Sequence, residues 1–178
     1  MVKLTWEQKV AIAKSIQLTI FGFTLSSVLS DSSWDQVQRD LKVAEIFSVA
    51  QSACKAAGAL GFAACAYDKF HGHPCILTRA GFMHALTLVM RVQCGGLVLV
   101  SPCCSSWGYP NVSKTKRSKE RPAGDCSYSK VRDGNFMARV ALFFYVLAIL
   151  RDADSVVEQS DGSYMWEHQP QQCMSHIL

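Results

Sequence analysis

Four segments with the composition of buried strands each end on a side chain that can take part in chemistry. These side chains are Ser48, Asp68, Cys103 of the pair Pro102-Cys103, and Glu158. A cysteine thiolate is a nucleophile, a carboxylate accepts hydrogen bonds or transfers a proton, and a hydroxyl caps a turn. Ligands of parallel sheets bind beyond the carboxyl ends of the strands, so we expect these four side chains to surround one cleft.

The elements that must position these residues alternate along the chain. Apolar runs predict strands at 43–47, 62–67, 97–100 and 155–158, and helical spacing predicts helices at 6–29, 34–41, 50–60, 80–92 and 135–150. A capping box formed by Thr5 and Gln8 favours the first helix start. The alternation predicts an α/β fold of three layers, with a mostly parallel sheet and helices on both faces. We expect a helical appendage at 1–41, the α/β domain at 42–170 and a tail at 171–178.

Positive charge is concentrated on one segment. Between residues 114 and 133 the basic side chains exceed the acidic ones by four, which accounts for the whole net charge of +4. The residues with which we associate this excess are Lys114, Lys116, Arg117, Lys119 and Arg121. A basic loop of this length is typical either of a polyanion-binding segment or of a solvated loop that keeps the protein soluble.

Composition argues against several classes of protein. The apolar run 16–29 is short and interrupted by polar residues, and Arg139 interrupts the apolar stretch 136–150, so we expect no membrane span. The positions of the eight cysteines, including the adjacent Cys103 and Cys104, do not form a disulfide framework. We therefore expect the protein in an intracellular, reducing compartment, and the nucleus is one such compartment. His71, His73 and Cys75 lack a second ligand pair at zinc spacing, so we expect no metal.

Four blocks of this sequence, in order, resemble motifs of the cytosine-5 DNA methyltransferases. They are Glu45-Ile46-Phe47-Ser48 with Gly61-Phe62 and Ala66-Tyr67-Asp68, then Ser101-Pro102-Cys103, then the basic loop, and finally Val156-Val157-Glu158-Gln159. The resemblance covers about residues 43–170 and is greatest to shortened, divergent members from protists, including dinoflagellates. It implies a Rossmann-like, methyltransferase-type domain that uses S-adenosylmethionine to methylate cytosine in nucleic acid.

The resemblance also implies a role for each block. Asp68 would hold the cofactor ribose, and Glu45, Phe47, Ser48 and Pro102 would complete the cofactor site. Cys103, with Cys104 as the second choice, would attack carbon 6 of cytosine, and Glu158 would act as the general acid at the ring nitrogen. The five basic side chains at 114–121 would contact nucleic-acid phosphates.

Two departures from the family pattern support an alternative function. Three glycines of the family's cofactor turn are Val49, Gln51 and Ser52 here, and the family's later motifs do not follow residue 170. The turn at Ser48 can equally be an ordinary strand–helix turn in which Ser48 has a capping role. The alternative is therefore a non-catalytic methyltransferase-fold protein, or a fragment, that binds nucleic acid through its basic loop without activity.

Overall fold

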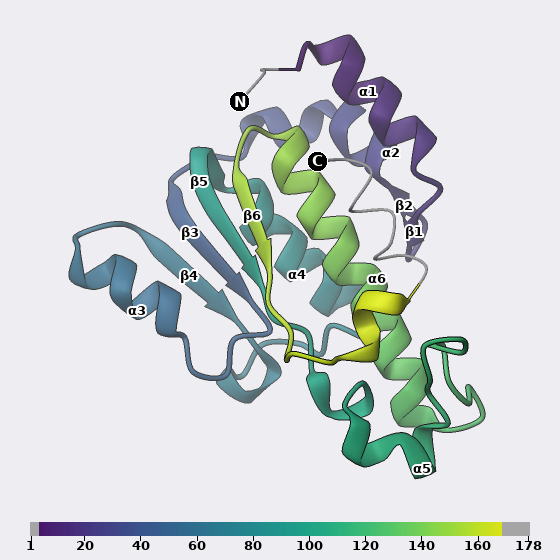
Figure 1. Ribbon diagram of the computed structural model, residues 1–178. Helices are drawn as coiled ribbons and strands as arrows, with labels where there is room; N and C mark the ends of the chain where they lie inside the picture. Colours follow the sequence, from purple (N-terminus) through teal and green to yellow (C-terminus); the bar gives the residue numbers. More distant parts are fainter. Residues whose placement is uncertain (1–3, 169–178) are drawn as a thin grey trace.

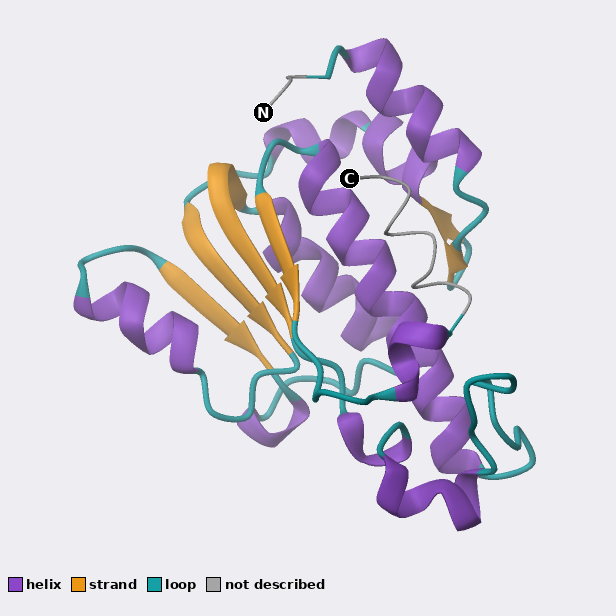
Figure 2. Ribbon diagram, viewed as in Figure 1, coloured by secondary structure: helices purple, strands orange, loops and turns teal. Residues whose placement is uncertain are grey.

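The computed structural model describes residues 4–168 as one α/β domain (Figures 1 and 2). The predicted tail at 171–178 and the last residues of the predicted α/β domain lie outside this range. The sheet strands are β3 (Leu41–Ile46), β4 (Ala64–Tyr67), β5 (Val92–Val100) and β6 (Asp154–Val157). The α-helices are α1 (Trp6–Ser15), α2 (Leu25–Ser30), α3 (Ser52–Ala59), α4 (Arg79–Met90), α5 (Val112–Thr115) and α6 (Ser129–Leu150).

The four predicted strands form one sheet in which every pairing is parallel. Their order is β4-β3-β5-β6, with Glu45 of β3 opposite Ala66 of β4 and Leu99 of β5. Val157 of β6 lies opposite Val100 of β5, so the strands end nearly level. The prediction of a parallel sheet built from these four segments is confirmed, and the carboxyl ends of the strands share one edge.

Helices lie on both faces of this sheet, although unequally (Figure 2). Strand β3 connects through α3 to β4 on one side, whereas β4 connects through α4 to β5, and β5 through α6 to β6, in the opposite direction. Right-handed crossovers then put α3 on one face and α4 with α6 on the other. The main core lies on the second face, where Ile46, Val98 and Val100 pack against the two long helices.

The long apolar helix α6 is the central element of this core. Residues 140–148 of the helix are all buried, because it packs against both the sheet and its neighbour α4. Its length and hydropathy would allow it to cross a membrane, but 67% of its most apolar window is buried inside the domain. A helix buried in this way is typical of a domain interior.

The single helix predicted at 6–29 is wrong. Helix α1 ends at Ser15, and a hairpin of β1 (Thr19–Ile20) and β2 (Phe23–Thr24) separates it from α2. Phe21 and Gly22 at the hairpin turn both have positive φ angles, +50° and +87°, which is the geometry that two-residue hairpin turns favour. Apolar spacing alone did not reveal this turn, because Phe21 belongs to the same apolar run as the residues around it.

Two further predictions of local structure need correction. Residues 34–41, predicted as a helix, contain a 3₁₀ turn, η1 (Ser32–Gln36), and then the first residue of β3. The segment 101–134, predicted as a loop, holds the 3₁₀ turns η3 (Cys104–Ser106) and η4 (Tyr109–Asn111), then α5, and the first six residues of α6. Gly134 made an early start of α6 difficult to predict, because glycine weakens a helix.

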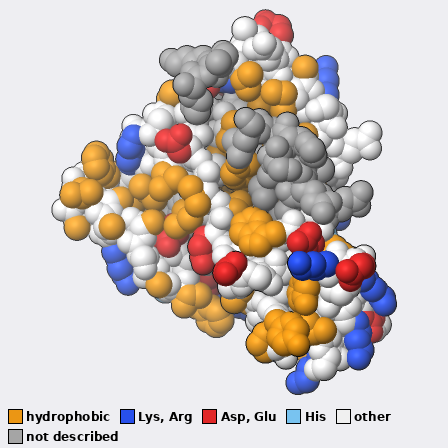
Figure 3. Space-filling model, viewed as in Figure 1, with side chains coloured by type: hydrophobic (Ala, Val, Ile, Leu, Met, Phe, Trp, Pro, Cys, Tyr) orange, Lys and Arg blue, Asp and Glu red, His pale blue; other side chains and the backbone are white. Residues whose placement is uncertain are grey.

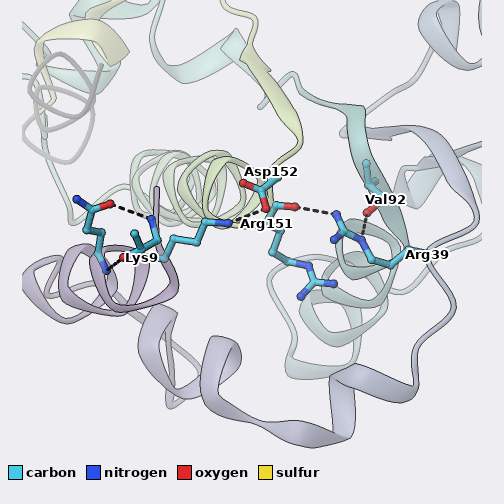
Figure 4. Close-up of polar contacts among 7 residues, drawn as sticks. Lys9, Arg39, Val92, Arg151 and Asp152 are labelled. Atoms are coloured by element: carbon cyan, nitrogen blue, oxygen red, sulfur yellow. Dashed lines mark hydrogen bonds and ion pairs between the residues drawn. The ribbon is translucent and has the colours of Figure 1, made fainter. Parts of the chain in front are cut away.

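Polar contacts fasten the N-terminal segment to the edge of the sheet opposite the strand carboxyl ends (Figure 4). Lys9 of α1 donates a 2.6 Å hydrogen bond to Asp152, in the turn after α6. Arg39, just before β3, donates to the carbonyl groups of Val92 and Arg151 at 2.8 and 2.7 Å. The first 40 residues also contribute Leu25 and other apolar side chains to the main core.

We predict that Lys9→Ala will lower the free energy of unfolding by about 1–2 kcal/mol, because it breaks a charged hydrogen bond whose acceptor, Asp152, stays partly in water. Lys14→Ala is the matched control, since Lys14 is an exposed lysine of the same helix, and it should change stability by less than about 0.5 kcal/mol. Urea denaturation measures both variants. Equal midpoints for the two variants would show that the ion pair does not fasten α1.

Candidate functional site

A cavity of about 630 Å³ opens at the carboxyl edge of the sheet. All seven residues predicted for the catalytic and cofactor roles line it: Glu45, Phe47, Ser48, Asp68, Pro102, Cys103 and Glu158. They come from the ends of all four strands, and the parallel sheet brings them together from positions up to 113 residues apart in the sequence. A volume of this size suits a cofactor or a drug-sized ligand.

Backbone hydrogen bonds fix the strand ends around the cavity. The N–H groups of Phe47 and Ser48 donate to the carbonyl of Tyr67, which joins the end of β3 to the end of β4. The N–H of Ser101 donates to the carbonyl of Ile46 at 3.0 Å, and that of Glu158 to Val100 at 2.9 Å. The cavity wall is therefore a continuation of the sheet rather than a set of independent loops.

The turn after β3 keeps a backbone shape that glycine normally supplies. Gln51, at one of the three positions where the resembled family has glycine, has a φ of +56°, in the left-handed region. The Ser48 hydroxyl accepts a 2.9 Å hydrogen bond from the Gln51 N–H, which closes the turn between β3 and α3. Val49 and Ser52 line the cavity, so side chains stand where glycines would leave bare backbone.

Glu45 occupies the amino end of α3. It is buried, and its Oε2 accepts a 2.9 Å hydrogen bond from the Cys54 N–H in the first turn of that helix. In dinucleotide-binding α/β domains a phosphate takes this place at the helix N-terminus. Here the Glu45 carboxylate already accepts the hydrogen bond of one N–H group at this helix end, and its negative charge disfavours a pyrophosphate there. Burial, and then the Glu45 charge, raises the pKa of the Cys54 thiol to about 12, which keeps it protonated and unreactive.

Asp68 and Pro102 are also held by short contacts. Asp68 is buried at the end of β4, and its Oδ1 accepts a 2.9 Å hydrogen bond from the Phe70 N–H. The amide of Gln159 donates to the Pro102 carbonyl at 2.8 Å, which ties the end of β6 to the turn that carries Cys103. Gln159 Oε1 is buried and, among the described residues, has no hydrogen-bond partner.

Cys103 lies in the cavity wall just after the end of β5. Its side chain is exposed, and its Sγ lies 3.2 Å from the Ser105 hydroxyl, which can donate a hydrogen bond to a thiolate. Cys104 is also exposed and lines the same cavity. The geometry therefore keeps both cysteines available, as the sequence suggested, and gives Cys103 a hydroxyl partner.

The cavity wall includes residues that sequence reasoning missed. Asp133 and Met137 project into it from α6, and Tyr67 and Cys75 line another part. Asp133 and Met137 are four residues apart and so share one face of α6. The helix predicted from the sequence begins at residue 135 and so excludes Asp133, whereas α6 begins at Ser129. With Asp133, the cavity is lined by four carboxylates and one lysine, Lys69, among largely apolar side chains.

The histidines of the segment after β4 contact neighbouring protein groups. His71 Nε2 lies 2.9 Å from the Val49 carbonyl, and the His73 ring stacks on Tyr67 with centroids 5.3 Å apart. Burial, and next the neighbouring His73, lowers the pKa of His84. The part of the chain that the structure describes holds no group of three or more side chains able to bind a metal ion.

The prediction that Arg117 contacts phosphate is wrong. Only 1% of Arg117 is exposed, and its guanidinium lies 3.4 Å from the centre of the Trp107 ring. It donates to the carbonyl oxygens of Ser106, Pro122 and Val131 and to Asn135 Oδ1. Burial lowers its pKa to about 10, so it stays charged at neutral pH. An arginine that fastens the loop from inside cannot be distinguished by sequence from its exposed basic neighbours.

The other predicted basic residues are exposed. Lys114 and Lys116 belong to α5 and its end, and Lys119 and Arg121 to the segment that follows. Figure 3 shows Lys and Arg side chains gathered at the lower right, over α5 and the start of α6. This side of the molecule lies beyond the carboxyl edge of the sheet (Figure 1).

No protein-family model, curated protein sequence or solved structure matches this chain. A function must therefore be inferred from the side chains of the cavity and their surroundings.

We predict that Arg117→Ala will destabilise the protein by about 3–5 kcal/mol, since it leaves several buried oxygen atoms unpaired and opens a space beside Trp107. Arg117→Lys should recover only part of this loss, because lysine lacks the planar fork. Arg121→Ala, an exposed neighbour, is the control and should cost less than about 0.5 kcal/mol. Urea unfolding followed by tryptophan fluorescence measures all three. A result for Arg117→Ala close to that for Arg121→Ala would refute the structural role.

Proposed function

We propose that this chain is an S-adenosylmethionine-dependent methyltransferase domain of the cytosine-5 type that acts on nucleic acid. The observation that carries this proposal is the convergence of the seven candidate residues on one cavity. They were selected from four separate segments by their resemblance to one family. Any parallel sheet brings its strand ends to one edge, so the support for this family lies in the residue types that meet there: the thiol of Cys103 and the carboxylates of Asp68 and Glu158, around a space large enough for a cofactor and a base.

The charge of the cavity supports the choice of cofactor. Glu45, Asp68, Asp133 and Glu158 make it acidic, and Glu45 occupies the helix end that would otherwise bind phosphate. A nucleotide with a chain of phosphates would be repelled, whereas S-adenosylmethionine, with a sulfonium, an ammonium and one carboxylate group and no phosphate, carries a net positive charge. Asp68 has one oxygen on the Phe70 N–H and would offer the other to the ribose hydroxyls.

When bound, S-adenosylmethionine supplies an electrophilic methyl group for carbon 5 of the base. The Cys103 thiolate would add to carbon 6 and make carbon 5 electron-rich. Ser105 would stabilise the thiolate through its hydroxyl, 3.2 Å away. Glu158 would hydrogen-bond to the ring nitrogen and so increase the electrophilicity of carbon 6. Methyl transfer would leave S-adenosylhomocysteine. Water would then accept the carbon 5 proton while the electron pair of that C–H bond re-forms the carbon 5–carbon 6 double bond and the Cys103–carbon 6 bond breaks, which restores the aromatic base and the free thiolate.

We predict that S-adenosylmethionine binds with measurable heat in a calorimetric titration, and that Asp68→Ala weakens binding by about tenfold or more through loss of a charged hydrogen bond. Asp161→Ala is the control, because Asp161 is an exposed aspartate outside the cavity lining, and it should bind like the parent. Adenosine triphosphate should not compete. Absence of binding by the parent protein would exclude the cofactor assignment.

We predict that an oligonucleotide containing 5-fluorocytosine forms a covalent adduct with Cys103 in the presence of S-adenosylmethionine. Fluorine cannot leave carbon 5 as a proton does, so the Sγ–carbon 6 bond persists after methyl transfer. Cys103→Ser should abolish the adduct, and Cys104→Ser should retain it. Denaturing gels and intact mass spectrometry detect the product. An adduct on Cys104 instead, or none with a protein that binds the cofactor, would reject Cys103 as the nucleophile.

A further inference from the structure

Tyr109 is an aromatic side chain that the catalytic proposal does not use. It is 77% exposed, which is the highest exposure among the large hydrophobic side chains of the described residues. It begins η4, five residues after Cys104 of the cavity wall. In the space-filling view, hydrophobic side chains lie beside Lys and Arg atoms over this part of the molecule (Figure 3).

The backbone that carries Tyr109 is fastened on both sides. The Asn111 amide donates to the Ser105 carbonyl at 2.5 Å, which joins η4 to η3 beside the cavity. The Thr115 hydroxyl donates to the Asn111 carbonyl at 3.0 Å, which joins η4 to α5. Trp107 is fully buried next to this segment and stacks against the Arg117 guanidinium. An exposed aromatic ring on a backbone held in this way is preorganised for binding.

Exposed cations continue directly from Tyr109. Helix α5 follows η4 without a break and presents Lys114, and Lys116, Lys119 and Arg121 come next along the chain. The cavity beyond Cys103 is acidic instead. A polyanion would therefore keep its phosphates on the α5 side and could insert only a base into the cavity, because bases carry no negative charge.

We propose that the polymer substrate is a single-stranded nucleic acid, in which a base adjacent to the target stacks on Tyr109 while Lys114, Lys116, Lys119 and Arg121 bind the phosphates. The identity of the reaction rests on the proposed function, but the strand preference does not. Exposed aromatics beside a basic track are the elements with which proteins hold single strands.

The opposite rim of the cavity supports the choice of one strand over two. That rim is formed by the turn after β3 and by the residues after Asp68, where Val49 and Phe70 are the exposed large hydrophobic side chains. Among the described residues, Lys69 is the one lysine or arginine that lines the cavity. Extruding a base from a duplex costs a few kcal/mol, which contacts between the protein and the nucleic acid must offset. A single strand needs no extrusion and makes its phosphate contacts on one side.

Fluorescence anisotropy with a labelled 12-nucleotide, cytosine-containing strand tests the proposal, in DNA and RNA forms and as the matching DNA duplex at equal salt. We expect the parent protein to bind at least one of the single strands about tenfold or more tighter than the duplex. Tyr109→Ala should weaken single-strand binding by about 5- to 100-fold through loss of one stacked base. Tyr109→Phe keeps the ring and should bind like the parent.

Two further variants test whether binding depends on the ring of Tyr109 in particular and on the charge of the lysines. Trp6→Ala removes another exposed aromatic, on α1 at the opposite end of the molecule, and should leave binding unchanged (Figure 1). The variant with Lys114, Lys116 and Lys119 all changed to alanine should reduce the steepness of the log–log salt dependence on single strands by about two.

Three results would overturn the proposal: duplex binding as tight as single-strand binding, no binding of any form at low salt, or a Tyr109→Ala variant that binds like the parent. These results are independent of the methyltransferase assignment. Failure to bind S-adenosylmethionine or to form the Cys103 adduct would remove the proposed reaction while leaving the single-strand preference intact. A duplex preference would leave the reaction intact.

Discussion

The segment between β5 and α6 depends on one buried cation. Arg117 has no carboxylate within its ion-pair distance among the described residues, and its charge is offset by carbonyl oxygens, the Asn135 amide and the face of Trp107. Those partners lie on η3, on the loop and in the first turns of α6. A single guanidinium therefore determines how the chain returns from the cavity edge to its longest helix, and so where Cys103 and Tyr109 lie.

The same contact explains Gly134, a residue that looks unfavourable in isolation, and the position of Met165. Gly134 lies inside α6, where glycine weakens a helix, but a Cβ there would come 2.3 Å from the Ser106 hydroxyl and 3.3 Å from Trp107 Nε1. Glycine is thus the residue that lets α6 approach the Arg117–Trp107 pair. Met165, in the 3₁₀ turn η5 (Tyr164–Glu167), packs against Trp107 and Ala138, which brings the segment after β6 onto the same centre.

Charge is divided between the two sides of this centre. The carboxylates face the cavity, whereas the exposed lysines lie beyond η4, so one site can attract a cationic cofactor and the adjoining surface a polyanion without either opposing the other. Coulomb interactions between exposed groups are screened within about 10 Å at ordinary salt, which allows neighbouring surfaces of opposite sign to act separately. The proposed functions of the cavity and of the loop use this separation.

The sequence by itself determined the sheet and the convergence of its strand ends. Ser48, Asp68, Cys103 and Glu158 could be expected around one cleft because each closes an apolar run, and the carboxyl ends of parallel strands always share an edge.

Tertiary structure decided the rest. The hairpin at Phe21 and Gly22 interrupts a run with continuous apolar character, and Asp133 joins the cavity only because α6 begins earlier than Gly134 suggests. In the sequence Arg117 cannot be told from the exposed lysines and arginine next to it. It is buried because Trp107 and several carbonyl groups from other segments surround it. A local sequence pattern reflects the propensity and periodicity of its own residues, whereas the burial of a side chain depends on which residues from distant parts of the sequence pack around it.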